Sequence, residues 1–367
     1  MSKAEISSNK VLVAMSGGVD SSVAAALLVE AGFQVAGVHL KFWSSGVKEE
    51  EQNVCCSLAS QGDARRVCDV LGIPFQVWDA EDMFYHEVVK SYLSELRYGR
   101  TPNPCVICNE RIKLGWLIDR AAATGFDMVA TGHWARIEHE TDGRLHLFRS
   151  VNEAKDQSYF LYRVTKEHLA RVLFPLGDFK TKDQVRDIAR RYQLPTGEKS
   201  ESQEICFIPD GDREAFIRRF APDTLETGPV KDTAGKTLGE HQGLALYTEG
   251  QRKGIKIAAA NRLYVTRKDV KRNTLILGDL EATGSLGLLA ADVVWLEPVS
   301  FPVKAEARIR FRGAGLLCTV TQEPDDRLKV SFDTAAQGVA PGQSVVFYQG
   351  DRILGGAIIR VQDQMSP

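Results

Sequence analysis

The first half of the chain alternates short apolar runs with longer segments of helical periodicity. Strands are predicted at 10–14, 34–40, 74–79 and 128–130, and helices at 21–31, 63–71, 83–98 and 109–124. Strands that alternate with helices form a parallel sheet covered on both faces, and such sheets bind ligands at the carboxyl ends of their strands. Ser16 and Gly132 each follow a predicted strand, so we expect both residues at that edge.

Beyond residue 130 the pattern changes. A hairpin is predicted over Arg136–Phe148, a basic amphipathic helix over Lys182–Tyr192 and a short strand over Glu204–Ile208. From Gly228 onward helical periodicity fades and turn residues recur, which is typical of small β-rich domains and barrels. We therefore predict an α/β protein with a doubly wound parallel sheet. Its expected domains are 1–210, a central β-rich domain at 211–283 and a C-terminal β-barrel at 284–367.

The turn after the first strand has the composition of an anion-binding loop. Ser16, Gly17 and Gly18 let the backbone turn sharply, which gathers N–H groups at the start of the next helix. No lysine follows these glycines, so the loop is not a G-x-x-x-x-G-K-[ST] phosphate loop. The neutralising charge is expected from the backbone, the helix end and a magnesium ion. Asp20 and the hydroxyls of Ser16, Ser21 and Ser22 are its candidate ligands.

From these residues alone, a plain strand-to-helix turn that uses glycine for steric reasons stays an equal alternative. The string Ser-Gly-Gly-Val-Asp-Ser-Ser at 16–22, however, resembles the PP-loop of the ATP pyrophosphatases. Enzymes of that superfamily grip the pyrophosphate of ATP and transfer AMP to a substrate oxygen. The resemblance implies that this loop binds ATP.

Composition sets the broad class of protein. The chain has 367 residues, of which 44% are hydrophobic and 26% charged, so we expect a globular protein of two or three domains. The N-terminus lacks the apolar core of a signal peptide, and no apolar run reaches transmembrane length. A cytoplasmic protein without a membrane partner is therefore expected. The net charge of −2 argues against a globally basic nucleic-acid binder, and DNA is not an expected partner.

Local charge nevertheless favours contact with RNA at two places. Between Arg252 and Arg272 stand eight lysines or arginines against the single acid Asp269. Residues 303–312 alternate strictly, and one face of that predicted strand carries four cations and one acid: Lys304, Glu306, Arg308, Arg310 and Arg312. Cations spaced along a strand suit a polyanion backbone. A solvated surface and a charged edge strand remain the simpler alternatives.

Seven cysteines make an odd count without the framework of a small secreted fold, so reduced thiols with metal or catalytic duties are expected. Cys105 and Cys108 form a C-x-x-C pair in the proline-stiffened loop 101–109. Asn109 is predicted to cap the following helix, and a thiol near a helix N-terminus is more nucleophilic. By itself the pair suits zinc, iron–sulfur or redox chemistry.

The other cysteines carry weaker signals. Cys206 stands alone in an apolar stretch, where a buried core position on a strand is the simplest interpretation. Cys68 and Cys318 are predicted to be core residues, and Cys55 and Cys56 receive no role. His133 could contact a nucleotide, although a structural histidine is the simpler interpretation.

Several motifs taken together resemble one family, the bacterial tRNA-specific 2-thiouridylases, and the resemblance runs nearly end to end. They are Ser16 to Ser22, Thr101 to Asn109, Ala130 to His133, Lys155 to Phe160, Ser202 to Phe207 and Gly239 to Gly243. The family implies a catalytic domain at 1–210 with a tRNA-binding insertion. It also implies that ATP and Mg²⁺ adenylate O2 of the wobble uridine. Sulfur from a relay protein or a cysteine desulfurase then replaces that oxygen.

The resemblance also implies residue roles. ATP would meet Ala14, Met15, Ser16, Gly17, Gly18, Val19, Asp20 and Ser21, with Leu40 and Gly132 on the adenosine side. Cys108 takes the nucleophile position and Cys206 the persulfide position. The target base would meet Asn103, Pro104 and Cys105, and the rest of the tRNA would meet Lys155, Asp156, Gln157, Arg310 and Phe311.

One position departs from the better-known members, which carry an aspartate where this chain has Cys105. An acid–base role is therefore not carried over to that position. The three cysteines Cys105, Cys108 and Cys206 instead resemble the C-x-x-C plus C subset, which holds a [4Fe–4S] cluster. A cluster and a persulfide relay both remain open. The rival functions are another PP-loop enzyme, such as a lysidine synthase or an amide-forming synthetase, and a non-catalytic tRNA-binding protein.

Overall fold

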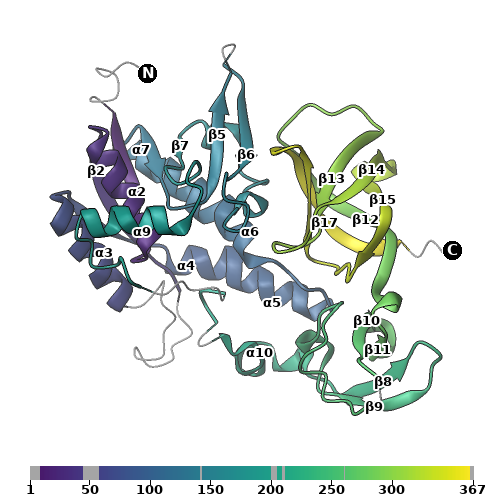
Figure 1. The fold of residues 1–367 in the computed structure, drawn as a ribbon. Helices are drawn as coiled ribbons and strands as arrows, with labels where there is room; N and C mark the ends of the chain where they lie inside the picture. Colours follow the sequence, from purple (N-terminus) through teal and green to yellow (C-terminus); the bar gives the residue numbers. More distant parts are fainter. Residues whose placement is uncertain are drawn as a thin grey trace. The chain divides into compact units, whose positions relative to one another are not determined.

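The computed structural model describes residues 9–43, 58–140, 143–199, 205–208, 211–259 and 261–363 (Figure 1). The chain divides into two compact units. Unit 1 comprises residues 1–89, 105–211 and 351–353, and unit 2 comprises residues 90–104, 212–350 and 354–367.

Unit 1 is built on the predicted parallel sheet. Among the described residues its strand order is β3-β2-β1-β4-β7, and each neighbouring pair is parallel. The strands are β1 (Lys10–Ala14), β2 (Gln34–Lys41), β3 (Phe75–Asp79), β4 (Met128–Ala130) and β7 (Val172–Leu173). Because β1 is aliphatic and buried on both faces, it takes the central position, with Leu12 opposite both Ala36 and Val129. The predicted strands and the predicted sheet are confirmed.

Helices connect these strands. They are α2 (Val19–Glu30), α3 (Leu58–Leu71), α4 (Glu81–Phe84), the π-helical turn η2 (Tyr85–Val89), α6 (Pro104–Cys108), the π-helical segment η3 (Asn109–Trp116), α7 (Leu117–Ala123), the 3₁₀ turn η4 (Ser158–Phe160), α8 (Lys166–Leu169) and α9 (Lys182–Arg191). Helix α2 packs beside α9 (Figure 1). Its small side chains Val23, Ala24, Ala25 and Ala26 are fully buried, so the backbone of the helix lies close to its neighbours.

One helix begins earlier than the sequence predicted. The segment expected to start at Asn109 starts at Pro104, because proline fits the first helical position, where its missing N–H costs nothing. Cys105 and Cys108 therefore lie within the helix rather than in a loop before it. Asn109 is buried inside the continuing helix, so the predicted capping role is wrong.

Two other segments complete unit 1. The predicted hairpin is confirmed as the antiparallel pair β5 (Ala135–His139) and β6 (Leu145–Arg149). The strand predicted at 204–208 is wrong for the part that is described: residues 205–208 form a turn, closed by a bond from Ile208 N–H to the Ile205 carbonyl of 3.0 Å. Among the described residues this segment pairs with no strand, and the Ile208 N–H finds its acceptor within the turn instead.

Unit 2 contains α5 (Lys90–Arg97), α10 (Arg213–Phe220) and two β structures. The first is a sheet in the order β10-β11-β8-β9, from β8 (Gly228–Asp232), β9 (Thr237–His241), β10 (Tyr264–Asp269) and β11 (Thr274–Gly278). The second runs β12-β15-β14-β13-β16-β17, and β17 pairs back with β12. That pairing closes a barrel, as predicted, around aliphatic and aromatic side chains such as Val320, Val330 and Phe347.

The barrel strands are β12 (Gly284–Trp295), β13 (Val303–Arg308), β14 (Leu316–Gln322), β15 (Leu328–Gln337), β16 (Ser344–Gln349) and β17 (Arg352–Asp363). Strand β13 ends at Arg308, so the predicted alternation to residue 312 is too long. Arg308 is not on an open face, because its guanidinium lies 5.4 Å from the ring centre of Tyr348 and its side chain is only 13% exposed. The row of four exposed cations is therefore interrupted.

Candidate active site

Residues 14–21, called loop 14–21 below, comprise the end of β1, the turn at 15–18 and the first residues of α2, and at Gly17 their backbone is one that only glycine allows. Gly17 has a φ of +74°, and a Cβ atom there would lie 2.3 Å from the carbonyl oxygen of Ser60 in α3. Gly18 is the N-cap of α2. The first N–H groups of a helix have no acceptor within the helix, so this end of α2 suits an anion.

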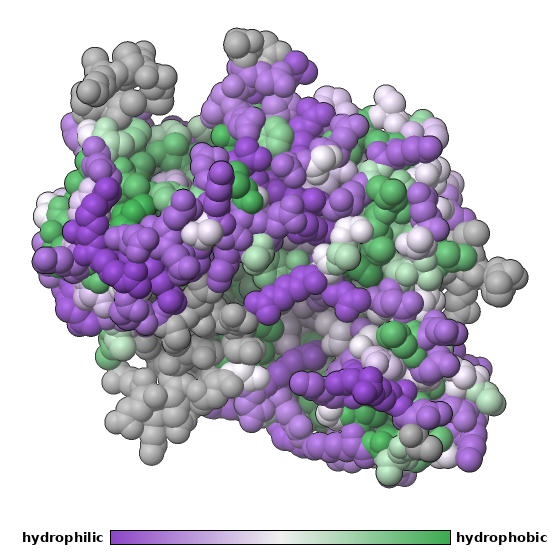
Figure 2. All heavy atoms as spheres, in the orientation of Figure 1, coloured by the Kyte–Doolittle hydropathy of each residue, from purple (hydrophilic) through white to green (hydrophobic). Residues whose placement is uncertain are grey.

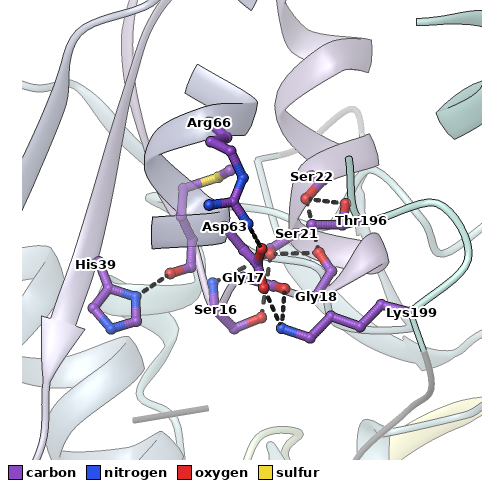
Figure 3. A network of polar contacts seen from close by, with 11 residues as sticks. Ser16, Gly17, Gly18, Ser21, Ser22, His39, Asp63, Arg66, Thr196 and Lys199 are labelled. Atoms are coloured by element: carbon purple, nitrogen blue, oxygen red, sulfur yellow. Dashed lines mark hydrogen bonds and ion pairs between the residues drawn. The ribbon is translucent and has the colours of Figure 1, made fainter. Parts of the chain in front are cut away.

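The hydroxyls of the loop mostly point inward (Figure 3). Ser21 and Ser22 are buried, and their Oγ atoms donate to the Gly18 carbonyl at 3.1 and 2.8 Å. Ser21 Oγ also accepts from the backbone N–H of Ser16 at 3.2 Å. In the structure these two hydroxyls stabilise the turn; their expected role as magnesium ligands stays a prediction. Ser16 is exposed.

Two lysines from distant parts of unit 1 reach this loop, and neither was predicted there from the sequence. Lys182, at the start of α9, pairs with both carboxylate oxygens of Asp20 at 2.7 and 2.8 Å. Lys199 Nζ lies 3.1 Å from the Gly17 carbonyl oxygen and 2.5 Å from Asp63 Oδ2. The sequence-based expectation named only the backbone, the helix end and a magnesium ion as sources of positive charge, and these lysines add two ammonium groups close to the loop.

No sequence motif or periodicity marks either lysine as a neighbour of the loop. Lys182 belongs to the basic amphipathic helix, whose polar side Figure 2 shows as a hydrophilic surface over α9. Lys199 lies in a turn that is fixed at Thr196, which is buried and donates from Oγ1 to Ser22 Oγ at 2.9 Å. Only the fold brings residues 182 and 199 beside residues 16–21.

The other residues expected to bind the nucleotide lie at the same sheet edge. A Cβ atom on Gly132 would lie 2.6 Å from the Ser21 nitrogen and 2.7 Å from the Asp20 carbonyl carbon, so β4 ends directly against α2. Leu40 is buried near the end of β2. Its neighbour His39 binds the Met15 carbonyl oxygen through Nδ1 at 2.8 Å, which holds the start of the loop to β2.

His133 has structural bonds, as the simpler interpretation predicted. Its Nδ1 lies 2.6 Å from Thr131 Oγ1, and its backbone N–H donates to the same oxygen at 3.3 Å. Loss of solvent and the nearby Lys113 lower the pKa of His133 to about 3. The imidazole therefore stays neutral near neutral pH.

The cysteines of the candidate site all lie in unit 1. Cys105 is half-buried and Cys108 is buried, one helical turn apart in α6. Cys206 is half-buried in the 205–208 turn, so the interpretation of a core residue on a strand is wrong. The turn is held through Phe207, whose ring centre lies 5.8 Å from that of Phe84. Within the described ranges no three His, Cys, Asp or Glu side chains group closely enough to hold a metal ion.

Cys68 and Cys318 are buried core residues, as predicted. Burial raises the pKa of Cys68 to about 11 and that of Cys318 to about 12, so neither supplies a thiolate near neutral pH. Cys55 and Cys56 lie outside the described residues.

Thr101, the first residue of the cysteine-bearing segment 101–109, belongs to unit 2. Thr101 donates its N–H to the Pro341 carbonyl at 2.7 Å, and its own carbonyl accepts from Gln343 Nε2 at 2.8 Å. Lys268 Nζ donates to Thr101 Oγ1 at 3.1 Å and lies 3.5 Å from Glu249 Oε2. Lys268 and Glu249 are both buried, so this ion pair anchors Thr101 from within the unit.

The residues expected to contact RNA differ in their burial and hydrogen bonds. Asp156 is buried, and its carboxylate accepts bonds from the N–H groups of Ser150 and Ser158, both at 3.1 Å. Gln157 Oε1 accepts from the Trp134 N–H at 3.0 Å. These two side chains shape the turn that carries Lys155, and Lys155 is half-buried.

Unit 2 presents further cations. Arg310 is exposed two residues beyond the end of β13 and donates to the Gln337 carbonyl, and Phe311 beside it is half-buried. In the 252–272 run Lys268 is buried, but Arg252, Lys256 and Arg262 line a hollow of about 460 Å³. Among the described residues no helix is long and apolar enough to cross a membrane.

Comparisons with known proteins identify relatives along the whole chain. Residues 9–210 match the family model of the tRNA methyl transferase HUP domain. Residues 214–279 match the tRNA methyl transferase PRC-barrel domain, and residues 285–359 match the aminomethyltransferase beta-barrel domain.

Full-length relatives carry a more specific name. The tRNA-specific 2-thiouridylase MnmA of Natranaerobius thermophilus is 44% identical over 359 residues, which cover 96% of this chain and 97% of the relative. The protein of the same name from Chloroflexus aggregans is 44% identical over 351 residues, 95% of this chain and 98% of the relative. That from Geotalea uraniireducens is 45% identical over 355 residues, covering 95% and 94%.

Proposed function

The chain belongs to the tRNA-specific 2-thiouridylase family, and from that premise we propose that it uses ATP to replace O2 of the wobble uridine of tRNA with sulfur. The observation that carries this proposal is the anion cradle of loop 14–21, with Gly17 at φ +74° and two lysines beside it. The family models are named for methyl transfer. A phosphate cradle and a C-x-x-C pair suit activation by ATP and transfer of sulfur, whereas methyl transfer requires neither.

The first step is activation of the base. Residues 14–21 would hold the triphosphate, with Leu40 and Gly132 beside the adenosine. O2 of the uridine attacks the α-phosphorus of ATP, the bond to the β-phosphate oxygen breaks, and pyrophosphate leaves. The product carries AMP on O2, which turns a poor leaving group into a good one. Mg²⁺ would travel with the phosphates, because Asp20 is already paired with Lys182.

The second step is sulfur transfer. A relay protein or cysteine desulfurase would load a persulfide onto Cys206. Its outer sulfur adds to C2, and AMP leaves with the O2 oxygen. Cys108 Sγ then attacks Cys206 Sγ, which breaks the persulfide bond, leaves the sulfur on C2 and forms a Cys108–Cys206 disulfide. A dithiol reductant returns both cysteines to thiols.

The same three cysteines would be the ligand set of the [4Fe–4S] cluster that the resemblance leaves open beside the persulfide relay. A bound cluster would offer its fourth iron to incoming sulfide. Cys105, Cys108 and Cys206 do not form a preassembled group of three in the described structure, so the steps above do not pass through a cluster. Iron and acid-labile sulfide, measured after anaerobic purification, decide between the two. An iron-free protein that is active with a persulfide donor would exclude the cluster.

The tRNA would be held by Asn103 to Cys105 at the base, by Lys155, and by Arg310 with Phe311 on the barrel. Asp156 and Gln157 would act by shaping the turn around Lys155, as their internal bonds suggest. The basic hollow at Arg252, Lys256 and Arg262 offers a further phosphate contact. A cytoplasmic location goes with this substrate.

The test is nucleoside analysis of tRNA from cells that lack this protein, complemented with variants of the chain. We expect 2-thiouridine to be lost on deletion and restored by wild type and by the matched control Cys68→Ala, but not by Cys108→Ser or Cys206→Ser. Cys105→Asp tests whether the third thiol is needed. Thiolation that survives both serine variants would contradict the cysteine roles. An unchanged 2-thiouridine level on deletion would favour a lysidine-forming or amide-forming enzyme, or a non-catalytic tRNA-binding protein.

A further inference from the structure

Loop 14–21 lacks the lysine that completes the common phosphate loop, yet it must hold a strongly negative group if it binds ATP. Residues 16–21 contain no lysine or arginine. Helix N-terminal N–H groups carry only about half an elementary charge. A cation from elsewhere in the chain would therefore add much to the binding of a pyrophosphate group.

We propose that Lys199 is this cation: it exchanges Asp63 for the β- and γ-phosphates of ATP when the nucleotide binds. The proposal rests on the proposed function, because it assigns a residue to the ATP that the function requires. It adds a binding residue that lies 182 positions from Gly17 in the sequence.

The position of Lys199 supports this role. Its Nζ lies 3.1 Å from the carbonyl oxygen of Gly17, so the ammonium already touches the loop backbone (Figure 3). The side chain is 25% exposed, and solvent or a ligand can reach it. Lys182 is less suited, because both oxygens of Asp20 bind its ammonium.

The turn that carries Lys199 is fixed to the loop by an independent contact. The Lys199 N–H donates to the Thr196 carbonyl at 3.1 Å. The buried Thr196 hydroxyl in turn donates to Ser22 in the first turn of α2 at 2.9 Å. The base of the Lys199 side chain therefore keeps its distance from the loop while its flexible end can move.

The partner of Lys199 can release it at low cost. Asp63 also pairs with Arg66, three residues further along α3. When Lys199 turns to a phosphate, the Asp63 carboxylate keeps the guanidinium as a counter-charge and is not left bare in a site where it is 15% exposed. An exchange between two anions costs less than the removal of a charge from its only partner.

The experiment compares ATP and AMP binding by calorimetry, with the full chain and a non-hydrolysable α,β-methylene ATP. Lys199→Met should weaken binding of this ATP analogue about 10- to 100-fold, the effect of one lost bond to a charged group, and leave AMP binding within about twofold. Lys199→Arg should recover most of the affinity. Lys166→Met, an exposed lysine on α8, is the matched control and should change neither.

A second variant separates binding from structure. Asp63→Asn removes the competing carboxylate, so it should leave binding of the ATP analogue unchanged or strengthen it, opposite to Lys199→Met. Equal losses of AMP and analogue affinity in Lys199→Met, or a loss in Asp63→Asn as large as in Lys199→Met, would show that the ion pair is structural and overturn the proposal. Failure of the wild-type chain to bind either nucleotide would instead contradict the proposed function itself.

Discussion

Replacement of Lys268 by methionine tests how unit 2 holds the start of the cysteine-bearing segment. Lys268 Nζ donates to the Tyr247 carbonyl and to Thr101 Oγ1, both at 3.1 Å, and lies 3.5 Å from Glu249 Oε2. Methionine fills a similar volume but has no charge and no donors. Lys268→Met therefore leaves the carboxylate of Glu249 buried without its counter-charge.

The size of the effect follows from this burial. Lys268 and Glu249 side chains are 1% and 4% exposed, and removal of one partner of such a pair costs about 3 to 5 kcal/mol. The double variant Lys268→Met/Glu249→Gln removes both charges, so it should recover all but about 1 kcal/mol, the part owed to the lost bonds at Thr101 and Tyr247. Lys271→Met, an exposed lysine in the same basic run, should change stability by less than about 0.5 kcal/mol.

The pH dependence of stability gives the prediction a second, independent readout. Burial raises the pKa of Glu249, against the attraction of Lys268. Without Lys268 that pKa rises further, and a carboxyl whose folded pKa is raised destabilises the fold as the pH rises through it. The deficit of Lys268→Met should therefore shrink when the pH falls from about 8 to about 5.

Two measurements test this prediction. Urea unfolding gives the stability of unit 2, and hydrogen exchange in peptides from residues 90–104 and 212–350 gives the local protection. The Thr101 amide, bound to Pro341, should lose protection in Lys268→Met and regain it in the double variant. If Lys268→Met is no less stable than Lys271→Met, or if its deficit is the same at both pH values, the buried pair does not anchor Thr101.

Three further predictions concern the sheet edge, the half-buried His133 and the barrel. Gly132→Ala should destabilise unit 1 by about 1 to 3 kcal/mol and weaken ATP binding, because its Cβ would lie 2.6 Å from the Ser21 nitrogen. Gly62→Ala, whose Cβ meets only Arg66 Nη1 at 3.5 Å, should stabilise α3, and equal effects in calorimetry would refute the argument. The pKa of His133 is about 3 in the folded protein and 6.5 in the unfolded chain. The fold therefore loses stability as the pH falls below 6.5. In urea unfolding, His133→Gln should reduce the slope of the unfolding free energy against pH by up to about 1.4 kcal/mol per pH unit. Replacement of the exposed His139 by glutamine should leave that slope unchanged. Arg310→Ala should weaken tRNA binding and lower its salt slope by about one unit, and an unchanged slope would remove Arg310 from the interface.

Local pattern was enough to predict most of the architecture. The alternation of apolar runs and helical segments predicted the parallel sheet, the hairpin and the closed barrel, because side-chain periodicity follows directly from backbone geometry. Predictions failed where neighbours outside the segment decide its conformation. Residues 205–208 have the composition of a strand but form a turn, and in the part of the chain that the structure describes they pair with no strand.

Some features of the candidate site were likewise predictable from local sequence, and others depend on the fold. The sequence by itself determined the glycine loop at 16–18, the cysteine pair at 105 and 108, and the family to which they point. Tertiary structure alone decided that Lys182 and Lys199 reach the loop, that Asp156 faces inward, and that Lys268 anchors Thr101. The physical reason is distance along the chain: a turn or a helix is specified by neighbouring residues, whereas an ion pair or hydrogen bond between residues more than 150 positions apart exists only after the chain has folded.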